Sequence, residues 1–144
     1  MIEDRREKFW EQLLKKAKEK TDLHAHNSPG VDRWLGTVVG KSGFSFGYVI
    51  NQKSAACELF IDGGKGSKNL NKRRFDVLYT HKKEIEQSFG GKLEWERMGM
   101  WRGSKITKRF KGRGLLDENK WDYLQDKMID AMIRLEAAVR EYVH

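Results

Sequence analysis

Lysine and arginine side chains are concentrated in the middle of this 144-residue chain, and their charge is the most informative chemistry in the sequence. The formal net charge is +8 at neutral pH, from 29 Lys and Arg residues against 21 Asp and Glu. Residues 63–116 alone carry 15 basic residues against 5 acidic ones. Such an asymmetric distribution produces a field that attracts polyanions such as nucleic acids. The alternative is an ordinary solvated surface that keeps the protein in solution.

One candidate anion site is the glycine-rich segment 62–68, which directly precedes a predicted helix. Glycine lets a backbone approach an anion closely, and the first N–H groups of a helix favour negative charge. The basic residues in and after this segment are Lys65, Lys68, Lys72, Arg73 and Arg74. They predict a phosphate contact, and the alternative interpretation is a flexible connector between a strand and a helix.

A second candidate site lies on the predicted strand 104–111 and the turn before it. Because side chains alternate along a strand, Lys105, Arg109 and Lys111 share one face, which we expect to meet water. Trp101 and Arg102 occupy a turn bounded by glycines, where an aromatic ring beside cations could stack on an unpaired base. For Trp101 the alternative is folding back onto the protein. Core packing is expected for most of the other tryptophans, including those at positions 34 and 95.

Two motifs for phosphate chemistry are incomplete. Residues 36–42 resemble a phosphate-binding P-loop but are one residue short, and residues 44–50 alternate like a strand where such a loop needs a helix. Restriction-endonuclease chemistry needs an acid-x-lysine motif and a further carboxylate for Mg²⁺. In Glu58-Leu59-Phe60, phenylalanine stands where lysine is required, and Glu94-Trp95-Glu96 is followed by Arg97. We therefore predict no catalytic residues.

Metal and thiol chemistry are not expected either. His24 and His26 are interpreted as an exposed pair that lacks further ligands at metal-site spacing, so no metal and no cofactor is predicted. Cys57 alternates with buried-type positions and is interpreted as a small core residue. A single thiol and the absence of a secretory leader favour the cytoplasm. No apolar stretch approaches the ~18–20 residues of a membrane-spanning helix, so membrane association is not expected.

Hydrophobic periodicity predicts the elements that must position these residues. Helical spacing marks residues 2–21, and turn residues fill 22–32. Alternation predicts three strands joined by short turns, which force antiparallel neighbours. The predicted elements are helix 2–21, strands 34–39, 44–50 and 56–61, one helix from the glycine loop to Phe89, strands 93–98 and 104–111, and a final helix after Asp117. We expect one α+β domain, residues 1–144, with a single mainly antiparallel sheet in αβββαββα order packed against helices. A restriction-endonuclease-like fold without the active site is the alternative.

Six sequence blocks are informative together: Phe9-Trp10, Gly40–Phe44, Val49–Asn51, Glu58–Asp62, Phe75–Tyr79 and Leu93–Arg97. They resemble a prokaryotic domain-of-unknown-function family, number 4268 (DUF4268). The resemblance extends from about residue 5 to residue 143, and its most specific block is Leu93–Arg97. The resemblance implies a neighbourhood, because members of this family often lie next to nuclease-like domains. It implies no catalytic residues, since none are established for the family.

These observations favour a non-catalytic nucleic-acid or polyanion binding module, associated with nuclease or defence systems. Phosphate contacts by Lys and Arg would then make its affinity fall steeply with salt. The first alternative is a protein-interaction subunit that docks on a nuclease-like partner through an apolar patch. A degenerate nuclease-like domain is a further alternative, and an enzyme comes last because no catalytic set is complete. DNA, RNA and an acidic protein remain open as the partner, as does the oligomeric state.

Overall fold

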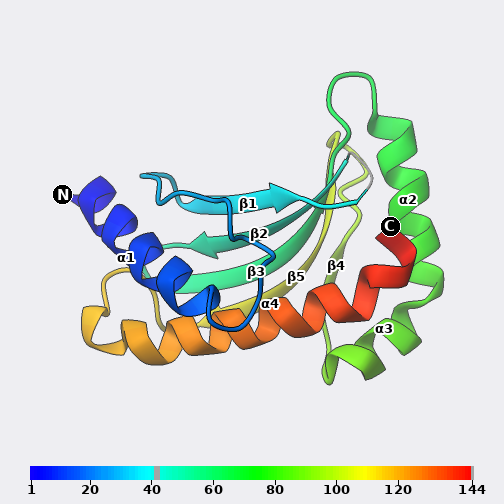
Figure 1. Ribbon diagram of the computed structural model, residues 1–144. Helices are drawn as coiled ribbons and strands as arrows, with labels where there is room; N and C mark the ends of the chain where they lie inside the picture. Colours follow the sequence, from blue (N-terminus) through cyan, green and yellow to red (C-terminus); the bar gives the residue numbers. More distant parts are fainter. Residues whose placement is uncertain (41–42, 144) are drawn as a thin grey trace.

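A computed structural model describes residues 1–40 and 43–143 and has an α+β fold (Figure 1). The predicted fold class is therefore confirmed. The described elements follow in the order α1 (Ile2–Ala17), β1 (Trp34–Val38), β2 (Phe44–Ile50), β3 (Ser54–Ile61), α2 (Lys68–Thr80), α3 (Lys82–Phe89), β4 (Glu94–Glu96), β5 (Ser104–Lys111), the 3₁₀ helix η1 (Glu118–Lys120) and α4 (Trp121–Val143).

In the described residues the strands form a five-stranded antiparallel sheet with the order β1-β2-β3-β5-β4. The first three strands make the meander that their short connections require. Strand β5 then pairs with β3 along its whole length, from Ser54 opposite Lys111 to Ile61 opposite Ser104. The short strand β4 precedes β5 in the chain but lies outside it, at the sheet edge. The predicted restriction-endonuclease likeness is not confirmed.

Helices α1 and α4 pack together and cover one face of the sheet (Figure 1). Alternation along β2 and β3 turns apolar side chains toward these helices, and α4 meets them with the apolar seam predicted from its spacing. Burying each large apolar side chain contributes about 1.5–3 kcal/mol. Cys57 lies in this core and its Sγ donates to the Met128 carbonyl, 3.1 Å away, so its predicted core role is confirmed. None of the helices in residues 1–40 and 43–143 is long and apolar enough to cross a membrane.

The prediction of one continuous helix to Phe89 is wrong, because the helix is interrupted at His81. That residue leaves the helical conformation at φ −105° and ψ 18°, between α2 and α3. Its ring stacks on Tyr142 of α4 with the ring centroids 4.5 Å apart. The break lets α3 pack along α4 while α2 packs at the β5 end of the sheet. Tertiary contacts of this kind leave no mark in the apolar spacing, which continues through the break.

Two predictions about single side chains are also wrong. His24 was expected to be exposed beside His26, but it is 2% exposed, with Nε2 2.9 Å from the Phe46 carbonyl and its ring beside Tyr48. Trp34 was assigned to the core but is 40% exposed. The P-loop-like pattern is followed by strand β2, as expected, and its Lys41 and Ser42 lie outside the described residues.

Candidate functional site

The sheet face opposite α1 and α4 carries aromatic, acidic and basic side chains, and we call it the open face. Its residues form three rows across the sheet, because the strands pair in register. Lys111 extends the face at the end of β5, and Arg33 lies just before β1. The rows are Trp34, Val49, Ala56 and Arg109; then Gly36, Gly47, Glu58, Thr107 and Glu94; and then Val38, Ser45, Phe60, Lys105 and Glu96.

Trp34 crosses the open face from the edge strand toward the centre. Its indole lies over Gly36 and Gly47, where a Cβ on either residue would overlap the ring. The indole Nε1 donates a hydrogen bond to Oε1 of Glu58, two strands away, over 3.0 Å. The two glycines are therefore required by the close approach of the ring and not by a turn.

Glu58 is a buried carboxylate at the centre of the open face, and its residue is only 7% exposed. Burial raises the pKa of Glu58 above its ordinary value, against the opposing effects of Lys105, the Trp34 hydrogen bond and Arg109. Its Oε2 lies 3.8 Å from Nζ of Lys105. A carboxyl group with a raised pKa among convergent cations is typical of functional sites.

The basic row predicted on β5 is partly neutralised. Arg109 bridges two carboxylates of β4, with Nε 2.9 Å from Glu94 and Nη2 3.1 Å from Glu96. Lys105 makes no hydrogen bond to the described part of the chain, so its ammonium keeps its donors beside Glu58. Lys111 is exposed, and no described residue pairs with it. Both Lys105 and Arg109 are part-buried, so only Lys111 faces water fully.

These side chains line a pocket of about 300 Å³ on the open face. Its walls are mostly apolar, while a carboxylate, two guanidinium groups, an ammonium and an amide converge on it. Pockets of this kind, apolar with a few placed polar groups, are where proteins bind small ligands or parts of larger ones. The lining residues are Arg33, Trp34, Val49, Asn51, Ala56, Glu58, Phe60, Lys105 and Arg109.

A second hollow of about 350 Å³ shares one lining residue, Phe60, with the first. It lies at the hairpin between β4 and β5, where Trp101 is 70% exposed and Met100 is 90% exposed. The alternative for Trp101 was that it folds back onto the protein. Most of this residue is in solvent, so it is not buried in that way. The other lining residues are Asp62, Met98, Arg102 and Gly103.

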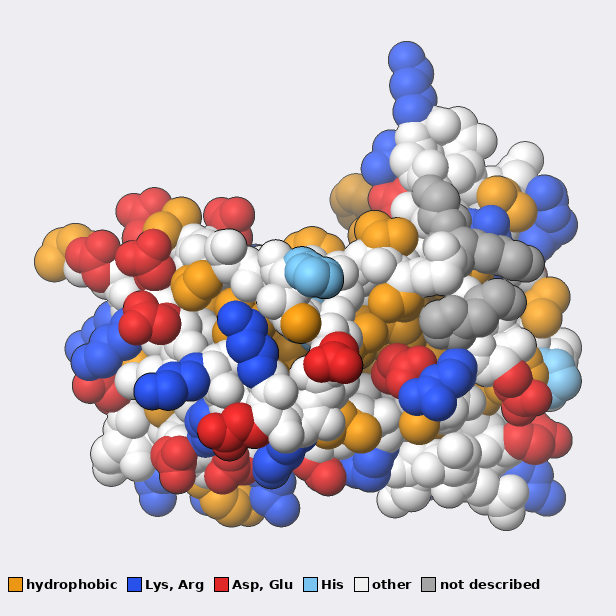
Figure 2. All heavy atoms as spheres, viewed as in Figure 1, with side chains coloured by type: hydrophobic (Ala, Val, Ile, Leu, Met, Phe, Trp, Pro, Cys, Tyr) orange, Lys and Arg blue, Asp and Glu red, His pale blue; other side chains and the backbone are white. Residues whose placement is uncertain are grey.

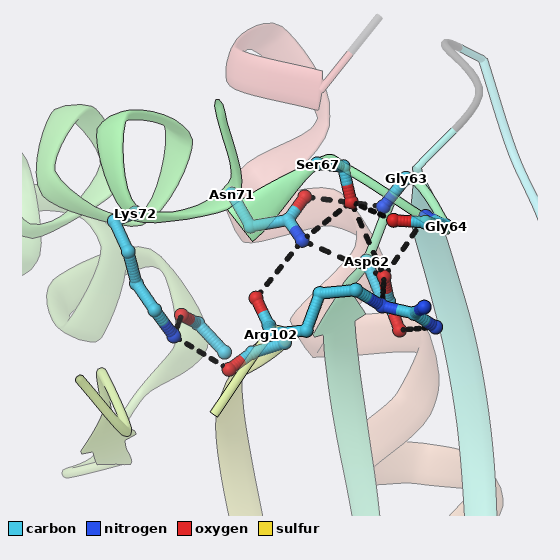
Figure 3. Close-up of polar contacts among 9 residues, drawn as sticks. Asp62, Gly63, Gly64, Ser67, Asn71, Lys72 and Arg102 are labelled. Atoms are coloured by element: carbon cyan, nitrogen blue, oxygen red, sulfur yellow. Dashed lines mark hydrogen bonds and ion pairs between the residues drawn. The ribbon is translucent and has the colours of Figure 1, made fainter. Parts of the chain in front are cut away.

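Lys72 is buried rather than exposed, and its ammonium contacts the hairpin (Figure 3). Its Nζ lies within 2.8 Å of four oxygens: the carbonyls of residues 97, 98 and 103 and the Ser104 hydroxyl. One of these carbonyls belongs to Met98, whose φ of 51° is strained for a side chain of this size. Burial lowers the pKa of Lys72. Its charge therefore positions the hairpin and is not displayed on the surface.

Arg102 is held at the base of the same hairpin by Asp62 (Figure 3). The guanidinium donates two hydrogen bonds, of 2.8 and 2.9 Å, to the carboxylate. These bonds hold the pKa of Asp62 below its ordinary value. Asn71 adds a hydrogen bond from its amide to the Arg102 carbonyl and accepts one from the Gly63 amide. The glycine loop and the hairpin thus form one polar assembly.

The remaining predicted residues surround the loop between β3 and α2. Lys65, Lys68 and Arg73 are exposed and make no ion pair within the described residues, while Arg74 lies over the Phe44 ring. The loop between β3 and α2 projects at the upper right of the view in Figure 1. Figure 2 shows basic side chains in this region, whereas basic and acidic side chains intermix over α1 and α4. The ten predicted residues therefore fall into two groups, one at this loop and hairpin and one on β5.

Sequence reasoning did not single out Trp34, Phe60, Glu58 or Arg33 as binding residues. For Trp34 a signal existed, since Gly36 and Gly47 on neighbouring strands leave room for a ring. The register that brings Glu58 beside Lys105 joins strands more than forty residues apart and carries no local signal. Within the described ranges, no cluster of three His, Cys, Asp or Glu residues could hold a metal ion.

The fold and this pocket define an α+β protein whose antiparallel sheet presents an open face lined by aromatic, acidic and basic side chains. Residues 5–143 match the family model described as "Domain of unknown function (DUF4268)", and the chain belongs to that family. This match confirms the resemblance seen in the sequence blocks. Neither a curated protein nor a solved structure matches the chain.

Proposed function

We propose that this protein is a non-catalytic module that binds single-stranded nucleic acid along the open face of its sheet. The observation that carries the proposal is the arrangement of Trp34, Phe60 and Trp101 along two hollows that share Phe60. Exposed aromatic rings stack on unpaired bases, and each stacked base contributes about 1–3 kcal/mol. An open antiparallel sheet face with aromatic side chains is a common platform for single strands.

Basic side chains beside these rings support the same proposal. Arg33 and Arg109 flank the first hollow, and Arg102 flanks the second. Lys105 keeps its donors, and Lys111 stands in solvent at the end of β5. Phosphates of a strand laid along β3 and β5 would meet these cations while its bases meet the rings. The net charge of +8 adds a long-range attraction for such a strand.

Fluorescence anisotropy with labelled DNA and RNA strands of about 12 nucleotides tests the proposal, since sheet modules bind ~4–16 nucleotides. Affinity should fall steeply between about 50 and 200 mM salt, because each neutralised phosphate contributes about 0.7 to the slope of log K against log salt. A duplex of the same sequence should bind more weakly, because its bases are not free to stack.

A triple variant with Arg33, Lys105 and Lys111 changed to Gln should lower that slope by about 2. The matched control changes Lys15, Lys18 and Lys20 to Gln, which removes the same charge from exposed positions in and just after α1. Equal losses in the two variants would mean that only net charge matters. Absence of binding to every strand at low salt would overturn the proposal.

The protein-interaction alternative is favoured by one observation, the exposed apolar tip formed by Met100 and Trp101. Such a tip could insert into a nuclease-like partner instead of stacking on a base. Changing both residues to Ser separates the two functions: loss of strand affinity supports nucleic-acid binding. Unchanged strand affinity would assign the tip to a protein partner.

A further inference from the structure

We infer that the pocket beside Glu58 accepts the base of an unpaired guanine nucleotide. This inference rests on the proposed function, because it names the base that the open face would select from a bound strand. It goes further in assigning a sequence preference, which stacking and phosphate contacts alone do not provide.

The pocket has the shape and lining that a planar base needs. Its volume is about 300 Å³, and Trp34, Val49 and Phe60 give it apolar walls. Its polar groups include the carboxylate of Glu58 on β3 and, on the neighbouring strand β5, the ammonium of Lys105 and the guanidinium of Arg109. Apolar walls bury the faces of a heteroaromatic ring, and the few polar groups select its edge.

Glu58 has acceptor capacity that the protein itself does not use. An ionised carboxylate offers about four lone-pair sites. In the described residues one hydrogen bond reaches it, from Trp34 Nε1 to Oε1, while Lys105 stays 3.8 Å from Oε2. The side chain is only 9% exposed. A carboxylate this deeply buried with a single donor favours a ligand that brings N–H groups of its own.

Guanine matches this set of groups better than the other bases. Its N1–H and N2–H₂ donors stand side by side and can both reach a carboxylate, and its O6 lies next to them for Lys105 or Arg109. Lysine and arginine commonly donate to guanine O6 and N7. Adenine and cytosine would turn a ring-nitrogen acceptor toward Glu58, and uracil or thymine would flank its one N–H with two carbonyls. Each of these bases would place a hydrogen-bond acceptor against the carboxylate, which is a repulsive contact.

The test uses thymidine strands that differ only at one central position, which carries G, A, C, T or inosine. Wild-type protein should bind the G strand about tenfold tighter than the A, C and T strands, within the range that a bidentate base contact provides. Inosine lacks the N2 amine and should lose a large part of that preference. Glu58→Gln should abolish the preference for G, so that the five strands bind the variant with similar affinity.

The matched control is Glu11→Gln, which removes an exposed carboxylate from α1 and should leave the preference intact. Equal wild-type affinity for all five strands would overturn the inference and leave the proposed function standing. Absence of binding to any strand would overturn both. A G preference that persists in Glu58→Gln, or one that inosine retains in full, would remove the assigned contact. The inosine comparison uses wild-type protein and so does not depend on the folding of any variant.

Discussion

Trp34 on β1 and Glu58 on β3 are joined by a hydrogen bond of 3.0 Å that spans the intervening strand β2. The indole can make this contact because Gly47 leaves the surface of β2 bare beneath it. The result is a buried carboxyl group on the open face, which lies opposite α1 and α4 and is not covered by a helix of the described residues (Figure 1). Such a group is a poor contributor to stability at neutral pH, and this points to a role in binding.

Changing Glu58 to Gln should not destabilise the protein at neutral pH and should alter how its stability depends on pH. Because burial raises the pKa of Glu58 above its ordinary value of 4.5, the native state still holds the Glu58 proton at pH values somewhat above 4.5. The contribution of Glu58 to stability is therefore full below that value and is lost as pH rises through the raised pKa. Thermal melts of both proteins from acidic to neutral pH would measure the difference.

The sign of that difference is specific. Relative to wild type, Glu58→Gln should gain stability as the pH rises from about 4.5 toward neutral, because only the wild type carries the Glu58 carboxyl group, which loses its proton there. The Lys105 ammonium, the Arg109 guanidinium and the Glu96 carboxylate also face this group and are common to both proteins. If the stability of Glu58→Gln relative to wild type fell as the pH rose, Glu58 would be a stabilising charge.

Gly47→Ala should displace the Trp34 indole from the sheet. The new Cβ would overlap the ring, and relieving such an overlap in a packed site costs about 1–3 kcal/mol. A lower melting temperature and a changed tryptophan fluorescence spectrum should appear together. Gly30→Ala is the control, because a Cβ at Gly30 would meet no atom within 4 Å. Native-like fluorescence and stability in Gly47→Ala would contradict the described position of Trp34.

Lys72→Met should lower the free energy of unfolding by about 2–3 kcal/mol, since it leaves buried carbonyls of the hairpin without their charged donor. Urea denaturation measures this change directly. Lys68→Met is the matched control on the same helix, because Lys68 is exposed and unpaired within the described residues, and it should shift stability by less than about 0.5 kcal/mol. Similar effects from both substitutions would place Lys72 on the surface instead.

Periodicity predicted most of the elements, because each depends on local burial. The alternation in β2 and β3 and the apolar seam of α4 are visible in the sequence and are present in the structure. The break at His81 was missed because it depends on Tyr142, which lies sixty-one positions further along the chain. Strand β4 is shorter than predicted, since beyond Glu96 the chain turns into the hairpin that Lys72 holds.

The site was only half visible in the sequence. Face alternation on β5 correctly grouped Lys105, Arg109 and Lys111, but the acidic partners of Lys105 and Arg109 come from other strands. Lys72 was predicted as a surface cation, since a sequence does not reveal that backbone carbonyls surround an ammonium. Pairing between distant strands is decided by the packed core, so the grouping on the open face had to come from the fold.

Indole N–H resonances in a ¹H–¹⁵N NMR titration with a single-stranded oligonucleotide test the central claim most directly. Trp34 lies on the open face and Trp101 on the hairpin beside it, whereas Trp10 and Trp121 are buried. The Trp34 and Trp101 signals should shift as the strand binds, while the Trp10 and Trp121 signals stay in place. Shifts confined to Trp10 and Trp121, or none at all at low salt, would contradict it.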